Sequence, residues 1–175
     1  MSGTTKRRPE HIIHQIAPVF DERSRVLILG TMPSPKSREL GFYYGHPQNR
    51  FWRVMAQLFQ SPFPQTTEEK RALMLKNRIA LWDVLHACTI KGAGDASIRN
   101  AEPNDIAPIL HAADIQAIFT TGTKAFALYN RHIRPVVGRE AILLPSTSPA
   151  NCAQSLDDLC RRYEVILTYL EEEHE

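Results

Sequence analysis

Four short apolar runs that alternate with helical patterns constrain the fold of this chain more than any other feature. The best-defined run, residues 25–30 (RVLILG), contains leucine, isoleucine and valine and stops at a glycine. Such a run is typical of a strand buried on both faces of a parallel sheet. Strands are expected over residues 25–30, 79–84, 115–120 and 141–144, and helices over residues 50–59, 66–77, 102–111, 123–133 and 155–173. The alternation predicts an α/β fold, an open and mostly parallel sheet with helices on both faces.

The length and composition favour one compact domain. The chain has 175 residues, of which 43% are hydrophobic, enough for a single core. We expect one domain with an N-terminal extension (residues 1–20) and an acidic tail (residues 171–175). No run approaches the roughly 18 apolar residues that cross a bilayer, and the polar N-terminus lacks the apolar stretch of a signal peptide. We therefore expect a cytoplasmic protein with no membrane partner, nucleoid-associated if the source is a bacterium.

The charge is distributed unevenly along the chain. The formal net charge is +2, yet four of the last five residues are glutamates. Without those four carboxylates the chain carries 21 basic and 15 acidic residues, a net charge of +6. A mildly cationic face suits nucleic-acid binding, although many proteins that bind no nucleic acid have a similar charge.

The cysteines give no sign of a metal centre. Cys88, Cys152 and Cys160 are odd in number, widely spaced and never arranged as C-x-x-C. That pattern excludes the usual zinc and iron–sulfur motifs and favours reduced thiols. We expect neither a metal nor another cofactor.

The first loop, residues 30–49 (GTMPSPKSRELGFYYGHPQN), is the first candidate for a binding site. It follows a predicted strand, and parallel sheets bind ligands at the carboxyl ends of their strands. It is far longer than the roughly 2–6 residues usual for a connection in an α/β unit, and loops of that length are often functional. It lacks both G-x-G-x-x-G and the P-loop spacing, so a dinucleotide or nucleotide phosphate motif is absent.

The second loop, residues 145–152 (PSTSPANC), follows the last predicted strand. Its hydroxyls and its amide suit contacts with phosphates. The same residue types also form capping turns before a helix. Both interpretations remain open on composition alone.

The two loops together resemble the signature regions of the uracil-DNA glycosylase superfamily. RVLILGTMPS followed by YYGHPQNRFW is similar to the first signature, in which HPxNxFW is the specific part, and STSPAN is similar to the second. The resemblance extends from about residue 25 to residue 169. It implies a three-layer α/β/α sandwich around a four-stranded parallel sheet. It also implies a monomer that extrudes a damaged base from double-stranded or single-stranded DNA and hydrolyses its N-glycosidic bond without a metal.

One departure from the pattern bears on the substrate. The mismatch-specific branch of the superfamily has an asparagine two residues after the strand-ending glycine, and this chain has Met32 there. The hypoxanthine-DNA glycosylase branch also lacks that asparagine and retains the one in HPxN, here Asn49. The resemblance therefore implies excision of hypoxanthine from deoxyinosine. The alternatives are a uracil or mismatch-specific glycosylase, and a non-catalytic module that binds DNA or nucleotides.

Asn49 and His46 are the candidate catalytic residues. The side-chain amide of Asn49 can orient a water molecule but cannot act as a strong base, so catalysis would depend on positioning. Asn49 also stands at the start of a predicted helix, where asparagine is a favoured N-cap, and the two roles are compatible. His46 is expected either to hydrogen-bond the base or the water or support charge on the leaving group, or to fix the loop through a backbone carbonyl.

The remaining residues of the first loop would form the base pocket. Tyr44 is the candidate stacking platform for the flipped base, or else a packing residue, which is the expectation for Tyr43. The wall of the pocket is expected from five residues at the strand end, which would otherwise form only a tight turn: Gly30, Thr31, Met32, Pro33 and Ser34.

The second loop would hold the DNA. Its candidate residues are Ser146, Thr147, Ser148 and Asn151 for the DNA backbone and Pro149 and Ala150 for a small wedge in the minor groove. Lys124, in TTGTKAF, is a possible phosphate contact or simply part of a helix start. The spacing of Asp83, His86 and Asp95 is not diagnostic, so these three are assigned structural roles.

Overall fold

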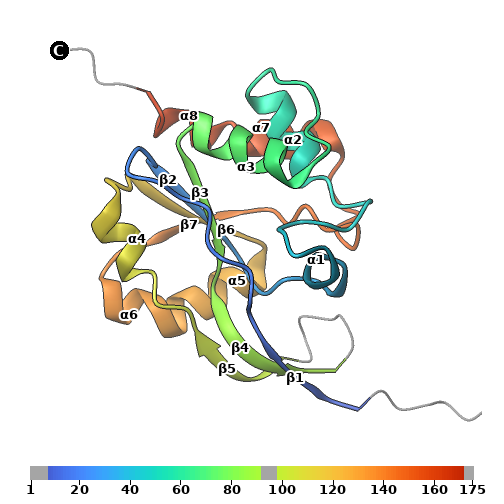
Figure 1. Cartoon of the computed structure of the whole chain (residues 1–175), viewed down its shortest axis with the longest axis vertical. Coiled ribbons are helices and arrows are strands. Elements are labelled where there is room, and N and C mark those ends of the chain that lie inside the picture. The colour runs from blue at the N-terminus through green and yellow to red at the C-terminus, as the bar shows by residue number, and fades with distance from the viewer. Residues whose placement is uncertain (1–7, 92–97, 172–175) are drawn as a thin grey trace, which may run out of the picture.

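The computed structural model describes residues 8–91 and 98–171. Its strands are β1 (Glu10–Ile13), β2 (Val26–Gly30), β3 (Ile79–Asp83), β4 (Leu85–Ile90), β5 (Arg99–Pro103), β6 (Ala117–Thr121) and β7 (Ala141–Leu144). Its helices are α1 (Pro35–Leu40), α2 (Phe51–Leu58), α3 (Thr67–Lys76), α4 (Ala107–Ala112), α5 (Thr123–Leu128), the π-helix η2 (Tyr129–Ile133), α6 (Arg134–Val137), α7 (Leu156–Tyr163) and α8 (Val165–Thr168). Figure 1 shows these elements along the chain.

The main sheet has four parallel strands in the order β3-β2-β6-β7. All five residues of β2, at the centre, are buried. Gly30 pairs with Asp83 at the end of β3, so the carboxyl ends of these two strands coincide. The predicted four-stranded parallel sheet is confirmed.

Successive residues of β2 point into two separate cores, as the period of two in a strand requires. Val26 and Ile28 pack with residues of α2, α3, α7 and α8. Leu27 and Leu29 pack with residues of α4, α5 and η2. Figure 1 shows these two groups of helices on opposite sides of the sheet, the three-layer arrangement that the resemblance implied.

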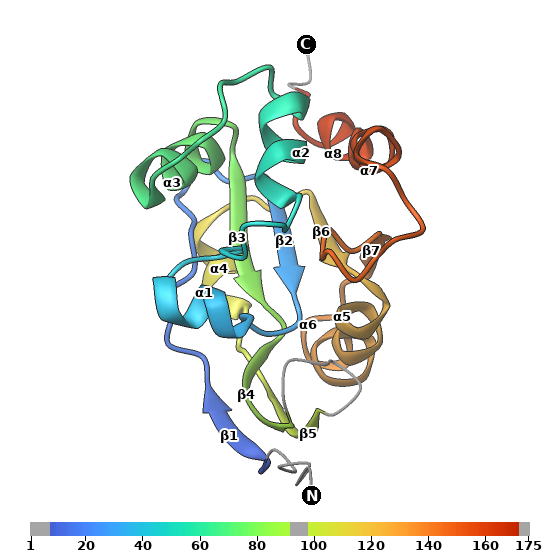
Figure 2. The same ribbon diagram turned by 90° about the vertical axis from the view of Figure 1, so that its right-hand side faces the viewer.

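A small antiparallel sheet, in the order β1-β4-β5, was not predicted. No strand was expected between residues 84 and 115, yet β4 and β5 lie there; Asp95 lies outside the described residues. The predicted helix over residues 102–111 is wrong at its start, because β5 continues to Pro103 and α4 begins at Ala107. The side-chain amide of Asn104 bonds the carbonyls of Asp83 and Leu85 and so turns the chain between them. In Figure 2 this sheet lies beyond the carboxyl ends of β2 and β3.

Two further predictions need correction, while a third is confirmed. The first loop contains α1, which Ser34 caps by accepting a bond from Ser37 N–H and which Gly41 ends with φ +72°. The predicted final helix divides at Glu164, because later N–H groups, such as that of Leu167, bond the carbonyl three residues back and wind the chain more tightly. The helix over residues 66–77 is present as α3, capped by the Thr66 hydroxyl.

No helix in the described part of the chain has the length and apolar character to cross a membrane.

The central position of β2 predicts an unequal response to truncation of strand residues. Ile28 is 0% exposed, and replacing it with alanine is expected to lower the free energy of unfolding by about 2–5 kcal/mol. Leu143, on the edge strand β7, is 36% exposed, so Leu143→Ala should cost less than about 1 kcal/mol. Urea unfolding of both variants measures the difference, and equal losses would contradict this account of the core.

Candidate active site

Side chains from several elements approach Gly30 at the carboxyl edge of the sheet. A Cβ placed on Gly30 would lie 2.5 Å from Asp83 Oδ1, 3.3 Å from the Tyr44 hydroxyl and 3.6 Å from Thr121 Oγ1. Real Cβ atoms do not approach an oxygen to 2.5 Å, so only glycine leaves room for the carboxylate at the end of β3. Three strands and the first loop thus converge on one small region.

Tyr44 crosses this region from the first loop. Its ring stacks on Phe51 with the centroids 3.9 Å apart and the planes 14° from parallel, and its hydroxyl lies 3.2 Å from Thr121 Oγ1. Its φ of +52° is uncommon for a tyrosine, so the surrounding contacts must hold it there. Burial, and next the charge of Asp83, raise the pKa of Tyr44 above its ordinary value, so the phenol keeps its proton at neutral pH.

Asn49 joins the two loops. Its Oδ1 accepts a hydrogen bond from Phe51 N–H at 2.9 Å and another from the Thr147 hydroxyl at 2.8 Å. These two bonds occupy both lone pairs of the carbonyl oxygen. The side-chain NH₂ of Asn49 has no partner among the described residues, so a half-buried donor stays free at the junction. Asn49 is thus not the N-cap of α2, which is Arg50, but from one residue earlier its side chain satisfies the N–H of the first helical residue, and it also retains a free donor.

Arg50 holds the second loop against the start of α2. Its guanidinium donates to the carbonyl of Gln154 at 2.6 Å, of Asn151 at 2.8 Å and of Ser148 at 3.4 Å. Its backbone N–H donates to the carbonyl of Thr147 at 3.1 Å. Arg50 was not among the predicted site residues, because nothing in the local sequence marks an arginine whose partners lie about a hundred residues away.

The side chains of the second loop bond largely within the loop itself. Ser146 Oγ accepts from Ser148 N–H, and Ser148 Oγ accepts from Ala150 N–H. The Asn151 amide donates to the carbonyl of Ser146 at 2.9 Å. Thus the turn interpretation describes the local structure, and Pro149 and Ala150 stand exposed at its tip.

The other residues expected in the wall of the pocket differ in their placement. Thr31 is buried and accepts Leu85 N–H through its carbonyl, and Met32 packs against the core that includes α4 and α5 residues. Pro33 is buried, while Ser34 is exposed and caps α1. Of the predicted wall residues, Gly30 is thus the one that approaches the Tyr44 hydroxyl in the described contacts.

His46 is exposed and belongs to the turn that presents Asn49. Its Nδ1 accepts Gln48 N–H at 3.1 Å, and its carbonyl accepts Asn49 N–H at 2.9 Å. The ring thus fixes the loop, but by accepting a backbone N–H and not through a backbone carbonyl as expected.

Lys124 lies half-buried in α5. Gly122, just before α5, bonds Leu144 through its N–H, and a Cβ on it would lie 3.4 Å from the Cβ of Ser146. Tyr43 is buried and donates its hydroxyl to the carbonyl of Ala17, which confirms its packing role.

Asp83 was assigned only a structural role from the sequence, yet its carboxylate lies at the centre of this edge. Its Oδ2 is 2.7 Å from His14 Nε2, and both side chains are almost fully buried. Ile16 N–H donates to His14 Nδ1, so the proton of the imidazole is on Nε2 and is donated to Asp83. The position of Asp83 at the end of a strand next to β2 was the signal that would have found it. His14 had no such signal.

Within residues 8–91 and 98–171, no three His, Cys, Asp or Glu side chains gather as metal ligands would.

Comparison with known proteins identifies the superfamily to which this chain belongs. The sequence matches the Uracil DNA glycosylase superfamily over residues 17–171. The chain belongs to this superfamily, which confirms the resemblance of its two loops. It is therefore a DNA glycosylase, an enzyme that cleaves N-glycosidic bonds in damaged DNA.

Two named relatives and one solved structure are similar to this chain. Over 135 residues the chain is 37% identical to a protein named "Hypoxanthine DNA glycosylase" from Methanosarcina acetivorans, which covers 76% of this chain and 84% of the relative. It is 34% identical over 136 residues to a protein of the same name from Methanosarcina barkeri, covering 77% and 85%. A solution NMR structure of a putative uracil DNA glycosylase from Methanosarcina acetivorans has a TM-score of 0.77 at 32% identity and covers 91% of this chain and 98% of its own.

The carbonyl contacts of Arg50 predict that it orders the second loop. In Arg50→Lys one ammonium replaces a guanidinium that reaches three carbonyls, so backbone amides over residues 146–154 should exchange with deuterium at least about tenfold faster. Arg53→Lys, on the exposed side of the same helix, is the matched control and should leave exchange unchanged. Unaltered exchange in Arg50→Lys would show that other contacts hold the loop.

Proposed function

We propose that this glycosylase removes hypoxanthine from deoxyinosine in DNA. The observation that carries the proposal is the free amide of Asn49, held next to the Tyr44–Phe51 stack in a site where Met32 takes the place of the asparagine found in the mismatch-specific branch. The names of the two Methanosarcina relatives support the same substrate.

The flipped base is proposed to stack on Tyr44. Phe51 backs one face of the ring, and no other aromatic side chain of the described residues stacks on it. A base on the opposite face would gain about 1–3 kcal/mol, which offsets much of the cost of leaving the duplex. The wall of the pocket would come from Gly30, Thr31, Met32, Pro33 and Ser34.

Asn49 is proposed to position the attacking water. Because both lone pairs of Oδ1 are occupied, the group that acts is the NH₂. It donates to one lone pair of the water and leaves the other directed at the anomeric carbon. Such a group positions the nucleophile without deprotonating it, so the rate would depend on alignment and on an electrostatically prepared site. The ring of His46 would assist through its free Nε2, since Nδ1 is occupied by Gln48 N–H.

The second loop is proposed to hold the DNA. The oxygens of Ser146 and Ser148 accept backbone N–H bonds, which leaves their hydroxyl protons free to donate to phosphate oxygens. The exposed tip of Pro149 and Ala150 would enter the minor groove and fill the vacated stack. Thr147 and Asn151 would keep the loop in shape, and Lys124 would add a phosphate contact.

A panel of duplexes tests the substrate. Each duplex carries one deoxyinosine, deoxyuridine, deoxyxanthosine or normal base, and abasic sites are scored after alkaline cleavage. We expect the highest rate at deoxyinosine. A higher rate at deoxyuridine would favour the second candidate, uracil, which the name of the solved structure supports. Binding without cleavage of any lesion would instead indicate a module that has lost its activity.

Substitutions at Asn49 separate its hydrogen bond to the start of α2 from its proposed catalytic role. Asn49→Ala should lower kcat/KM for deoxyinosine at least about tenfold, or about 1.4 kcal/mol of transition-state stabilisation. Asn49→Ser restores an oxygen that can accept Phe51 N–H, so its Tm should stay close to that of the wild type. Its activity should nevertheless fall as in Asn49→Ala, because the NH₂ is missing. Full activity in Asn49→Ser would move the catalytic assignment elsewhere.

A further inference from the structure

The two carboxylate oxygens of Asp83 have different surroundings. Oδ2 receives the Nε2 proton of His14 at 2.7 Å. Oδ1 faces Gly30, and no hydrogen-bond donor of the described residues reaches it. Nor is Oδ1 one of the polar atoms that are sealed from solvent without a partner. A largely buried carboxylate oxygen without a donor is unfavourable, so its retention at the site suggests a ligand that supplies one.

We infer that Asp83 Oδ1 accepts a hydrogen bond from the ring N–H of a deaminated base, N1–H in hypoxanthine, and so selects the base to be removed. This inference rests on the proposed function and names the group that would read the substrate. Asp83 is then a specificity-determining residue, and His14 is a positioning residue that acts through it.

The ring of Tyr44 sets the direction in which a base would lie. Its hydroxyl end approaches Gly30, Asp83 and Thr121. Its ring stacks on Phe51, the residue whose N–H is bonded to Asn49. A base stacked along this ring can direct its pairing edge toward Asp83 while its sugar lies toward Asn49. The two residues would therefore act at opposite ends of the same nucleotide.

The chemistry of a carboxylate fits the lesion. A carboxylate only accepts hydrogen bonds, and hypoxanthine offers the donor N1–H where adenine, its parent base, offers the acceptor N1. Sites with a buried polar group discriminate strongly against ligands that leave it unpaired. Uracil and xanthine also carry ring N–H groups and fit the same rule. The carboxylate does not by itself distinguish hypoxanthine from guanine, which shares N1–H.

His14 fixes which oxygen faces the base. The imidazole cannot rotate freely, because Ile16 N–H donates to Nδ1 while Nε2–H donates to Asp83. Its backbone N–H donates to the carbonyl of His86 at 2.6 Å, which ties it to the small antiparallel sheet. With Oδ2 occupied, Oδ1 is left as the free acceptor, and the absence of a side chain at Gly30 gives it room.

Asp83→Asn tests the inference by reversing one hydrogen bond. His14 would still donate to the amide oxygen, and the NH₂ would replace Oδ1, so a donor would face N1–H. The Kd is measured for duplexes that carry hypoxanthine or unsubstituted purine, which lacks N1–H, on a 2′-fluoroarabino sugar that resists cleavage. The preference of the wild type for hypoxanthine over purine should fall at least about tenfold in Asp83→Asn. This ratio does not depend on the fraction of protein that is folded.

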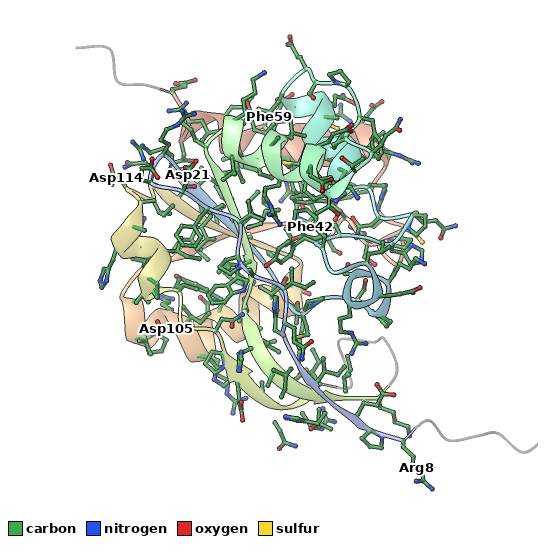
Figure 3. All side chains as sticks on the ribbon, viewed as in Figure 1. Arg8, Asp21, Phe42, Phe59, Asp105 and Asp114 are labelled. Atoms are coloured by element: carbon green, nitrogen blue, oxygen red, sulfur yellow. The ribbon has the colours of Figure 1, made fainter. Side chains whose placement is uncertain are left out.

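Controls separate this effect from general damage. Asp114→Asn changes an exposed aspartate at the rim of the molecule, far from Phe42 of the first loop in Figure 3, and should leave the ratio unchanged. Binding to a duplex with an abasic analogue should be similar in the wild type and in both variants, because no base is present to be read. Gly30→Ala, whose Cβ would displace Asp83 Oδ1, should lower the preference as Asp83→Asn does and serves if Asp83→Asn does not fold.

An unchanged preference in Asp83→Asn would overturn the inference, as would an equal fall in Asp114→Asn. Cleavage of deoxyinosine by the wild type is measured in parallel. A wild type that cleaves deoxyinosine while Asp83→Asn keeps its preference would refute only the role of Asp83. A wild type that cleaves no deaminated base would refute the proposed function itself.

Discussion

The site depends on the carbonyl oxygen of Asn49. By accepting both Phe51 N–H and the Thr147 hydroxyl, it fixes the start of α2 and the second loop relative to one another. Arg50, the next residue, then bonds three carbonyls at or just beyond the second loop. A short stretch at the end of the first loop thus connects two segments about a hundred residues apart. The same geometry leaves the NH₂ of Asn49 free, because both contacts of the side chain are made by its carbonyl oxygen.

The opposite end of the site depends on a missing side chain. Gly30 lets the Asp83 carboxylate, the Tyr44 hydroxyl and Thr121 approach one point at the end of β2. The parallel register, in which Gly30 pairs with Asp83, brings the carboxylate there. Residues that bind DNA or position water would come from the loops, whereas the group proposed to read the base comes from a strand. A strand end is held more rigidly than a loop, which suits a residue that discriminates between bases.

Local sequence patterns predicted the main sheet but not the contacts that complete the site. The apolar run at residues 25–30 forms β2, which is buried throughout, and its apolar composition is typical of such a strand. β5 has the sequence RNAEP and is mostly exposed, so no apolar alternation marked it. The resemblance directed attention to Asn49 and Tyr44, whereas His14 is meaningful only through Asp83, 69 residues away. Pairings of that range are set by topology and cannot be read from spacing.

The coupling between Asn49 and Thr147 tests the central claim most directly. Single-turnover excision of deoxyinosine is measured for Asn49→Ala, Thr147→Val and the double variant. The account predicts that Thr147→Val slows excision in the wild type by at least about fivefold and has no further effect in Asn49→Ala, a coupling energy of about 1 kcal/mol. Independent effects of the two substitutions, multiplying in the double variant, would contradict the claim that this hydrogen bond assembles the site.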